Sequence, residues 1–185
     1  MNMSRFFSGF VLATALVTSG NLVQAQSLRP SGVASLGEMG CLAINANRGS
    51  GKYNVINDDF SVSLQVLRAV AYLGGGSHRH RPPAAIGTKY STQVACRLAA
   101  PSEEPKLKTL SLTLGIPDSS YLEGYPRLSV YKDGNFTGYK DVRKGELTSW
   151  IIDVKNTRSI ALEGECVRSN HNECPAIFFF EDILE

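Results

Sequence analysis

One aspartate, two tyrosines and an arginine lie within ten residues of each other in the second half of the chain. Asp118, Tyr121, Tyr125 and Arg127 belong to the segment LGIPDSSYLEGYPRL at residues 114–128. Aromatic rings can stack on the apolar face of a sugar, while a carboxylate and a guanidinium hydrogen-bond its hydroxyl groups. Because binding residues concentrate on loops between strands, these four residues are our candidate ligand-binding rim.

The same segment also has two other interpretations. Asp118 with Ser119 and Ser120 can form hydrogen-bonded turns, and a tyrosine beside Pro126 can pack over the end of a strand. Asp118 is in addition a candidate ligand for a structural calcium ion, which prefers carboxylate and carbonyl oxygens. The residues leave these alternatives open, and no other metal or cofactor is expected.

The remaining polar residues do not form a catalytic set. The run GGGSHRHRPP at residues 74–83 reads as a solvated basic loop, in which Arg79 and Arg81 would repel a metal cation from His78 and His80. The chain contains no GxSxG or HExxH motif. Its adjacent carboxylates, at 58–59, 103–104 and 181–182, are not placed across a cleft by the sequence, as glycoside hydrolysis would need. We therefore expect no enzyme activity.

The amino-terminal residues have the pattern of a secretory signal peptide. Arg5 precedes an apolar stretch at residues 6–17, and Val23-Gln24-Ala25 supplies a small-x-small cleavage site. The apolar stretch is shorter than the roughly 20 residues that a membrane-spanning helix needs. The sequence therefore predicts a signal peptide at 1–25, no membrane span after processing, and an exported protein, periplasmic or extracellular.

Four cysteines, Cys41, Cys96, Cys166 and Cys174, follow the predicted leader. In an exported chain an even number of cysteines favours disulfides, and the spacings do not match those of a zinc site. Cys166 and Cys174 bracket a short polar loop, so we pair them with each other. This leaves a second disulfide between Cys41 and Cys96.

Length and charge set limits on the class of protein. The chain has 185 residues and a formal net charge of +2, which falls to +1 when the leader with Arg5 is removed. A chain of this size forms one domain with its own core. The near balance of charge gives no electrostatic reason to expect nucleic acid as a partner.

The first part of the mature chain is the least clear. Residues 26–40 are rich in Ser and Gly and are predicted to be a flexible lead-in to a single domain at 41–185. The turn-like RGSG at 48–51 lies between two short strand-like runs, which suggests a hairpin. Residues 60–72 fit a strand or a helix, and the spacing of Phe60, Leu64, Leu67 and Ala71 favours a short helix.

After Tyr90 the pattern is typical of β-strands. Leu110, Leu112 and Leu114 alternate with polar residues, as do other apolar pairs further along, and turn signals such as Asp133-Gly134 separate the runs. This predicts a mainly all-β chain folded as an antiparallel β-sandwich or jelly roll. The same alternation assigns Trp150 to the core rather than to a sugar platform.

Four short motifs in the second half resemble the NPCBM family of carbohydrate-binding modules. They are LGIPDSS at 114–120, VYKDGN at 130–135, WIIDV at 150–154 and IFFFEDILE at 177–185, and the resemblance covers residues 90–185. Two features depart from the family pattern: Pro117 precedes Asp118, and VRSNHNEC stands before the last strand.

The resemblance implies a galactose-binding-like jelly roll and a sugar-binding role. We accordingly expect an exported, non-catalytic module that binds a polysaccharide or another glycan at the cell surface or in the matrix. The alternative is a structural or protein-interaction β-sandwich without a sugar site, because a fold by itself does not fix a function.

Overall fold

A computed structural model describes residues 32–44, 51–76, 85–87, 91–169 and 173–185. The predicted signal peptide at 1–25 lies outside these ranges, as do most of the predicted basic loop and residues 170–172 of the polar loop between Cys166 and Cys174. Among the residues described, no helix has both the length and the apolarity that crossing a membrane requires.

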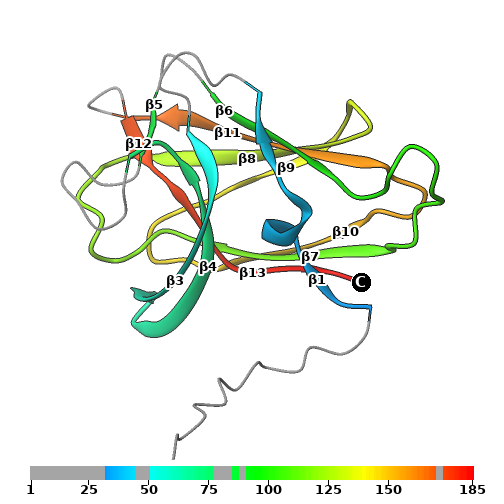
Figure 1. The fold of residues 1–185 in the computed structure, drawn as a ribbon. Coiled ribbons are helices and arrows are strands. Elements are labelled where there is room, and N and C mark those ends of the chain that lie inside the picture. The colour runs from blue at the N-terminus through cyan, green and yellow to red at the C-terminus, as the bar shows by residue number, and fades with distance from the viewer. Residues whose placement is uncertain (1–31, 45–50, 77–84, 88–90, 170–172) are drawn as a thin grey trace, which may run out of the picture.

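Two antiparallel sheets lie face to face and form a β-sandwich, as the sequence predicted (Figure 1). The first sheet, sheet A, has the order β10-β7-β13-β4-β3, with β1 pairing with β13. Its strands are β1 (Ala34–Ser35), β3 (Lys52–Val62), β4 (Gln65–Gly74), β7 (Thr109–Gly115), β10 (Thr148–Asp153) and β13 (Ile177–Leu184).

The second sheet, sheet B, has the order β2-β6-β11-β8-β9. Its strands are β2 (Leu42–Ala43), β6 (Thr92–Arg97), β8 (Tyr125–Lys132), β9 (Asn135–Asp141) and β11 (Ser159–Arg168). A small additional sheet pairs β5 (Ala85–Gly87) with β12 (Glu173–Pro175). Neighbours in each sheet are often distant in sequence, so the pairing is set by the packed core rather than by local turns.

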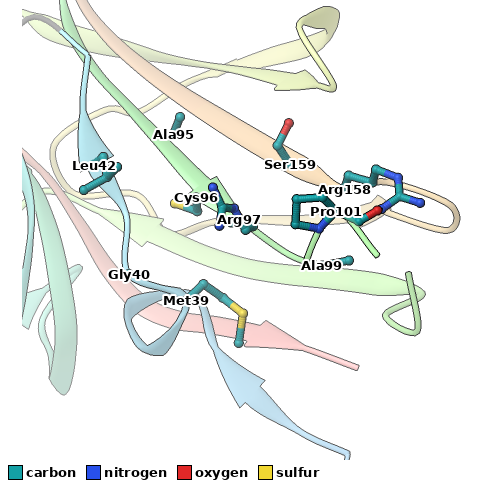
Figure 2. A pocket seen from close by; sticks show the side chains of 10 residues that line it. All are labelled: Met39, Gly40, Leu42, Ala95, Cys96, Arg97, Ala99, Pro101, Arg158 and Ser159. Carbon is teal, nitrogen blue, oxygen red and sulfur yellow. The ribbon is translucent and has the colours of Figure 1, made fainter. Parts of the chain in front are cut away.

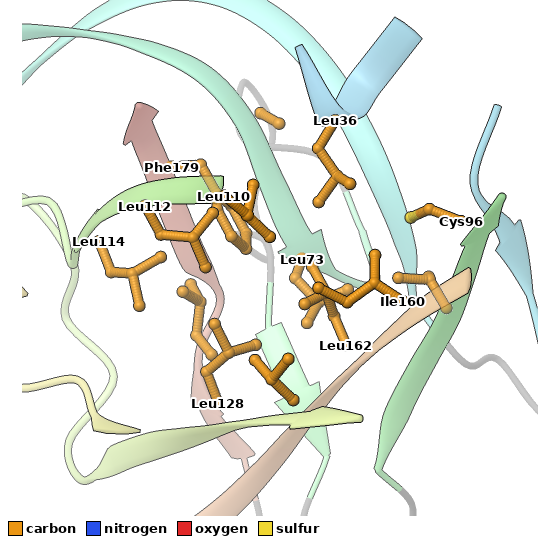
Figure 3. Close-up of a cluster of buried hydrophobic side chains, with 14 of the residues drawn as sticks. Leu36, Leu73, Cys96, Leu110, Leu112, Leu114, Leu128, Ile160, Leu162 and Phe179 are labelled. Atoms are coloured by element: carbon orange, nitrogen blue, oxygen red, sulfur yellow. The ribbon is translucent and has the colours of Figure 1, made fainter. Parts of the chain in front are cut away.

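The core fills the space between the two sheets with aliphatic side chains. Leu110, Leu112 and Leu114 of β7 point towards Leu128 of β8 and Leu162 of β11, and all five are almost completely buried (Figure 3). These are the inward positions of the period-two pattern, which a strand imposes because successive side chains point to opposite faces. The strand alternation predicted after Tyr90 is therefore confirmed.

Trp150 faces the interior but lies at the edge of the sandwich. It pairs with the buried Leu112 and packs against the core, yet it stays partly exposed because β10 is an edge strand. Its ring reaches across to β9, where a side chain on Gly138 would come 3.4 Å from the indole. The indole thus closes the open edge between the two sheets, in agreement with the predicted core role.

The predicted helix at 60–72 is wrong. Residues 52–62 and 65–74 form the long hairpin β3–β4, which turns at Ser63 and Leu64. The helical spacing was misleading because Leu64, one of its apolar positions, is exposed at the tip of the hairpin. The spaced apolar residues therefore do not form one buried face. Most of the turn predicted at residues 48–51 lies outside the described residues, and the flanking strands β2 and β3 pair with β6 and β4.

The second half of the predicted flexible lead-in, residues 34–40, is instead part of the fold. β1 extends sheet A, and a 3-10 helix, η1 (Leu36–Met39), follows with Ser35 and Glu38 forming a capping box at its start. Leu36 is fully buried in the core. Composition alone could not reveal this anchoring, because it depends on the burial of Leu36 and on contacts with β13, which is distant in sequence.

Both predicted disulfides are present. Cys41–Cys96 joins the residue before β2 to β6, and Cys166–Cys174 joins the end of β11 to β12. All the cysteines are therefore paired with each other, and none is free.

Candidate functional site

Asp118, the first residue of the predicted rim, holds a turn of the backbone. Its carboxylate accepts hydrogen bonds from the Ser61 hydroxyl at 2.6 Å and from the backbone nitrogens of Ser63 and Leu64 at 3.2 and 3.3 Å. These bonds, the Ser61 bond first, lower the pKa of Asp118 below its ordinary value. Ser63 and Leu64 have φ values of 52° and 64°, a region that costs energy for residues other than glycine. Asp118 therefore braces the strained β3–β4 turn.

Tyr121 and Tyr125 differ in their surroundings. Tyr121 is 60% exposed on the loop between β7 and β8, whereas Tyr125 begins β8 and is half-buried. The Arg143 guanidinium lies over the Tyr125 ring, 4.1 Å from its centroid. One face of the Tyr125 ring is thus occupied by a cation, which fixes the ring in place.

A pocket of about 340 Å³ opens beside Tyr125 at this end of the sandwich. We call it the loop-end pocket, and its lining residues come from three separate segments: Glu123, Gly124, Tyr125, Arg143, Lys144 and Arg168. Three of these residues are basic and one is acidic. The pocket can therefore offer several hydrogen-bond donors to hydroxyl or carboxylate oxygens of a ligand.

Close backbone packing sets the shape of the loop-end pocket. Gly124 has a φ of +101°, and a Cβ there would collide with the Arg168 carbonyl. Opposite, the Lys144 ammonium donates to the Ser120 carbonyl at 2.6 Å. The loop between β7 and β8 is thus held between β11 and the β9–β10 loop, and only glycine permits this approach.

Arg127 follows Tyr125 by two residues and points from the same face of β8. Its guanidinium binds the Asp141 carboxylate through two nitrogens, at 2.7 and 3.3 Å, and lies 4.0 Å from the Tyr139 ring centroid. Glu165 is a more distant partner at 3.9 Å. The Asp141 bond raises the pKa of Arg127. These contacts hold the head group in a fixed geometry on the outer face of sheet B.

Of the four predicted residues, Tyr125 lines the loop-end pocket and Arg127 extends the same strand face. Asp118 contributes to the hairpin turn, and Tyr121 is exposed on the adjoining loop. Sequence reasoning missed Arg143, Lys144 and Arg168, because they lie far along the chain in runs typical of polar loops. Pairing of β8 with β11 brings Arg168 to Tyr125, and pairing of β8 with β9 brings Arg143 and Lys144, which follow β9, to the same end.

A second polar cluster lies on the outer face of sheet B. The Glu163 carboxylate accepts hydrogen bonds from the Gln93 amide at 2.6 Å, from the Tyr131 hydroxyl at 2.7 Å, and from Ser91. Burial works to raise the pKa of Glu163, but the hydrogen bonds outweigh it and the pKa is lowered. The bond to Glu163 also raises the pKa of Tyr131 to about 12.

Two hollows lie near this cluster, and the second is lined by its residues Gln93, Tyr131 and Glu163. The first, of about 550 Å³, lies between η1 and β2 on one side and the start of the β6–β7 loop on the other (Figure 2). Its lining residues are Met39, Gly40, Leu42, Ala95, Cys96, Arg97, Ala99, Pro101, Arg158 and Ser159. The second, of about 250 Å³, is lined by Ile44, Gln93, Tyr131, Gly134, Ala161, Leu162 and Glu163.

In the part of the chain that the structure describes, no group of three or more His, Cys, Asp or Glu residues could hold a metal ion. Asp118 accepts hydrogen bonds from the Ser61 hydroxyl and two backbone N–H groups. Its role as a calcium ligand stays a prediction.

No protein-family model matches the sequence, and no curated protein matches it at a significant level. Solved structures do match. A CBM51 module of Clostridium perfringens GH95, solved with methyl-galactose, aligns at a TM-score of 0.55 with 8% identity, covering 83% of this chain and 99% of the module.

Two further structures align similarly. The tandem CBM51 modules of a family 98 glycoside hydrolase from Streptococcus pneumoniae give a TM-score of 0.55 with 11% identity, over 84% of this chain and 47% of theirs. The CBM51-2 and INT domains of Clostridium perfringens ZmpB, solved with GlcNAc, give 0.54 with 13% identity, over 83% of this chain. The chain spans only 31% of that ZmpB structure. These likenesses show that the chain has the β-sandwich fold of carbohydrate-binding modules.

Proposed function

We propose that this protein is an exported, non-catalytic module that binds carbohydrate through its loop-end pocket. The observation that carries the proposal is the arrangement of Tyr125 beside Arg143, Lys144 and Arg168 in one pocket at the end of a carbohydrate-module fold. Tyrosine supplies an apolar surface with a polar tip, and the basic side chains supply donors for sugar oxygens.

Three lines support this choice over other functions. The solved neighbours include modules in complex with methyl-galactose and with GlcNAc. The sequence motifs resemble the NPCBM family of carbohydrate-binding modules. Two disulfides are typical of exported domains, which agrees with the predicted leader and with a glycan partner outside the cell.

The experiment is a glycan array on the mature protein, followed by titration of the best ligand into variants. Tyr125→Ala and Arg168→Gln should each weaken binding at least about tenfold, which corresponds to roughly 1.4 kcal/mol. Lys155→Gln is the matched control, because it removes an exposed cation from the turn that follows β10. Binding that is equally strong in all three variants would contradict this site.

Tyr121→Ala tests the rest of the predicted rim. Tyr121 is exposed on the loop next to the pocket, so it can reach a ligand that extends beyond the first sugar. The double variant Tyr121→Ala/Tyr125→Ala should therefore lose more affinity than Tyr125→Ala alone. Asp118→Asn should affect stability rather than affinity, since its carboxylate faces the hairpin turn.

A second candidate function is supported by a different observation. At the tip of the β3–β4 hairpin Leu64 is 96% exposed and Val66 77% exposed, on a strained turn braced by Asp118. Strained residues persist where the surrounding structure fixes them, and adjacent exposed apolar side chains can form a contact surface for a protein partner. A blank glycan array, together with photo-crosslinking from position 64 but not from position 155, would favour a protein-interaction domain instead.

A further inference from the structure

We propose a second glycan site on the outer face of sheet B, distinct from the loop-end pocket. The proposal concerns the two hollows described above, which lie side by side because Ala95 of the first pairs with Ala161 of the second. We call the combined depression the alanine groove. It rests on the proposed carbohydrate-binding function but on none of the residues of the loop-end pocket.

The strand register creates the groove. One residue from each of the five strands of sheet B pairs with the next, and directly paired residues share one face of a sheet. In strand order, these residues are Leu42, Ala95, Ala161, Tyr131 and Phe136. The two central residues are alanines, whereas the outer ones are large. A floor of methyl groups therefore lies between an aliphatic wall on β2 and an aromatic wall on β8 and β9.

Both walls are unusually exposed for apolar side chains. On one side Leu42 is 75% and Ile44 54% exposed, and on the other Phe136 is 59% exposed. Tyr131 stands edge-on to Phe136, with ring centroids 5.6 Å apart. Contiguous exposed apolar surface of this kind marks an interaction site more often than scattered single residues do.

The polar groups in the groove indicate what it binds. Glu163 lines the second hollow, two residues along β11 from Ala161, where its carboxylate would repel an anionic ligand and would be costly to bury under an acyl chain. Two arginines, Arg97 and Arg158, lie at one end of the groove and would repel a cation there. The Arg158 guanidinium donates to the carbonyls of Ala100, Pro101 and Glu103.

A neutral ligand with many hydroxyl groups fits both charges. Its hydroxyls can donate to the Glu163 oxygens and accept from the Arg97 guanidinium, while its ring C–H faces can lie on the alanine floor and the aromatic wall. Tyr131 and Gln93 already hold the Glu163 carboxylate in place, so binding would cost little side-chain ordering. The groove therefore fits a segment of a neutral glycan chain.

The test uses the mature protein with galacto-oligosaccharides and chito-oligosaccharides of one to six residues. NMR chemical-shift mapping should move the backbone signals of Ala95 and Ala161 and the side-chain amide of Gln93. Affinity should also rise with chain length, because a longer chain contacts more of the groove. Unmoved groove signals at saturation with every bound oligosaccharide would overturn the proposal.

A substitution that fills the groove gives the second readout. Ala161→Tyr should weaken binding of the longest oligosaccharide to the groove at least tenfold. The NMR signals of the loop-end pocket should still shift when the oligosaccharide is added. Ser149→Tyr is the matched control, because it adds the same bulk to an exposed position on the outer face of sheet A. If Ala161→Tyr fails to fold, Glu163→Gln supplies the same test with almost no change in volume.

The outcomes separate this proposal from the previous one. Parent protein that binds some oligosaccharides but shows responses only around Tyr125 and Arg168 would overturn the groove and leave the loop-end pocket standing. If Ala161→Tyr and Glu163→Gln both leave oligosaccharide binding unchanged, the groove is likewise overturned and the loop-end pocket stands. Parent protein that binds no sugar at all, on the array or by NMR, would overturn both.

Discussion

At the scale of single residues, two carboxylates are each held in place by several hydrogen bonds. Asp118 braces the β3–β4 turn, and Glu163 joins Gln93 and Tyr131 on the outer face of sheet B. Both are acceptors for several donors, and both have a lowered pKa. Such bonds fix side-chain geometry, but their effect on stability depends on pH because they need the ionised form.

We expect Asp118→Asn to destabilise the hairpin. An asparagine keeps one acceptor oxygen but loses the charge, so the bonds from Ser61, Ser63 and Leu64 weaken. The folded pKa is lowered, so the stabilising contribution of Asp118 is present above pH ~4 and is lost as pH falls through the lowered value. Urea unfolding of parent and variant between pH 2 and pH 7 measures this: the difference in stability should shrink towards acid pH.

The control for this experiment is Asp133→Asn, because the Asp133 carboxylate accepts from the backbone nitrogens of Arg158 and Ser159, away from the β3–β4 turn. A constant difference between Asp118→Asn and the parent at every pH would contradict the charge-based explanation. In that case the loss would come from altered packing of the loop instead.

The corresponding prediction at alkaline pH concerns the contribution of Tyr131 to stability. Its pKa is raised to about 12 by the bond to Glu163, so the protonated phenol is favoured in the folded state. Its contribution to stability is therefore complete below pH ~10, the ordinary pKa of tyrosine, and is lost as pH rises towards 12. Tyrosinate absorbance during alkaline titration should show a late-titrating group that moves earlier in Glu163→Gln. An unchanged titration curve in that variant would contradict the link.

At the scale of elements, the two disulfides fix very different lengths of chain. Cys41–Cys96 closes a sequence separation of 55 residues and ties β2 to β6, whereas Cys166–Cys174 closes only 8. Loop-closure entropy grows with loop length, so the longer loop should contribute more. The first disulfide also holds the aliphatic wall of the alanine groove, because Leu42 follows Cys41 directly.

Removing the disulfides one at a time tests this difference. By the chain-entropy model, Cys41→Ser/Cys96→Ser should lower the free energy of unfolding by about 4 kcal/mol and Cys166→Ser/Cys174→Ser by about 2.5 kcal/mol. Denaturant unfolding of each double variant measures both values. Equal losses, or a larger loss for the short loop, would show that packing around the bonds matters more than loop length.

At the scale of the whole molecule, a buried carboxylate ties the start of the domain to its end. Asp182 on β13 is 3% exposed and accepts hydrogen bonds from the Ser35 hydroxyl, the Gly37 backbone nitrogen and the Tyr53 hydroxyl. Burial, with the charge of Asp182 and the bond to it, holds the pKa of Tyr53 well above its usual value. β1, η1, β3 and β13 are thereby joined at one point.

Asp182→Asn should therefore cost roughly 1.5–3 kcal/mol of global stability, the range for a hydrogen bond to a charged group. Tyr53→Phe should cost less, because it removes one donor and leaves two. Hydrogen exchange of the residue 34–40 segment would check that the loss is felt there first. Full protection of that segment in Asp182→Asn would show that Leu36 and β1 pairing suffice to anchor it.

The sequence by itself determined most of the strands after Tyr90, the sandwich class and both disulfide pairs, but not β9 or β12. Those features follow from local patterns: a strand alternates its side chains with period two, so Leu110, Leu112 and Leu114 mark an inward face. The Asp133-Gly134 turn is equally local, since both residues adopt positive φ. The disulfide pairing could be predicted because Cys166 and Cys174 enclose a short loop. Pairing them leaves Cys41 and Cys96 to pair with each other.

The tertiary structure decided the rest. Residues 60–72 carry a helical spacing, but pairing of β4 with β13 and with β3 overrides it. Among the predicted site residues, strand pairing places Tyr125 beside Arg143 and Arg168. Asp118 instead binds the β3–β4 hairpin turn. Contacts between segments far apart in sequence depend on how the sheets pack, and no local pattern of residue types encodes which strands become neighbours.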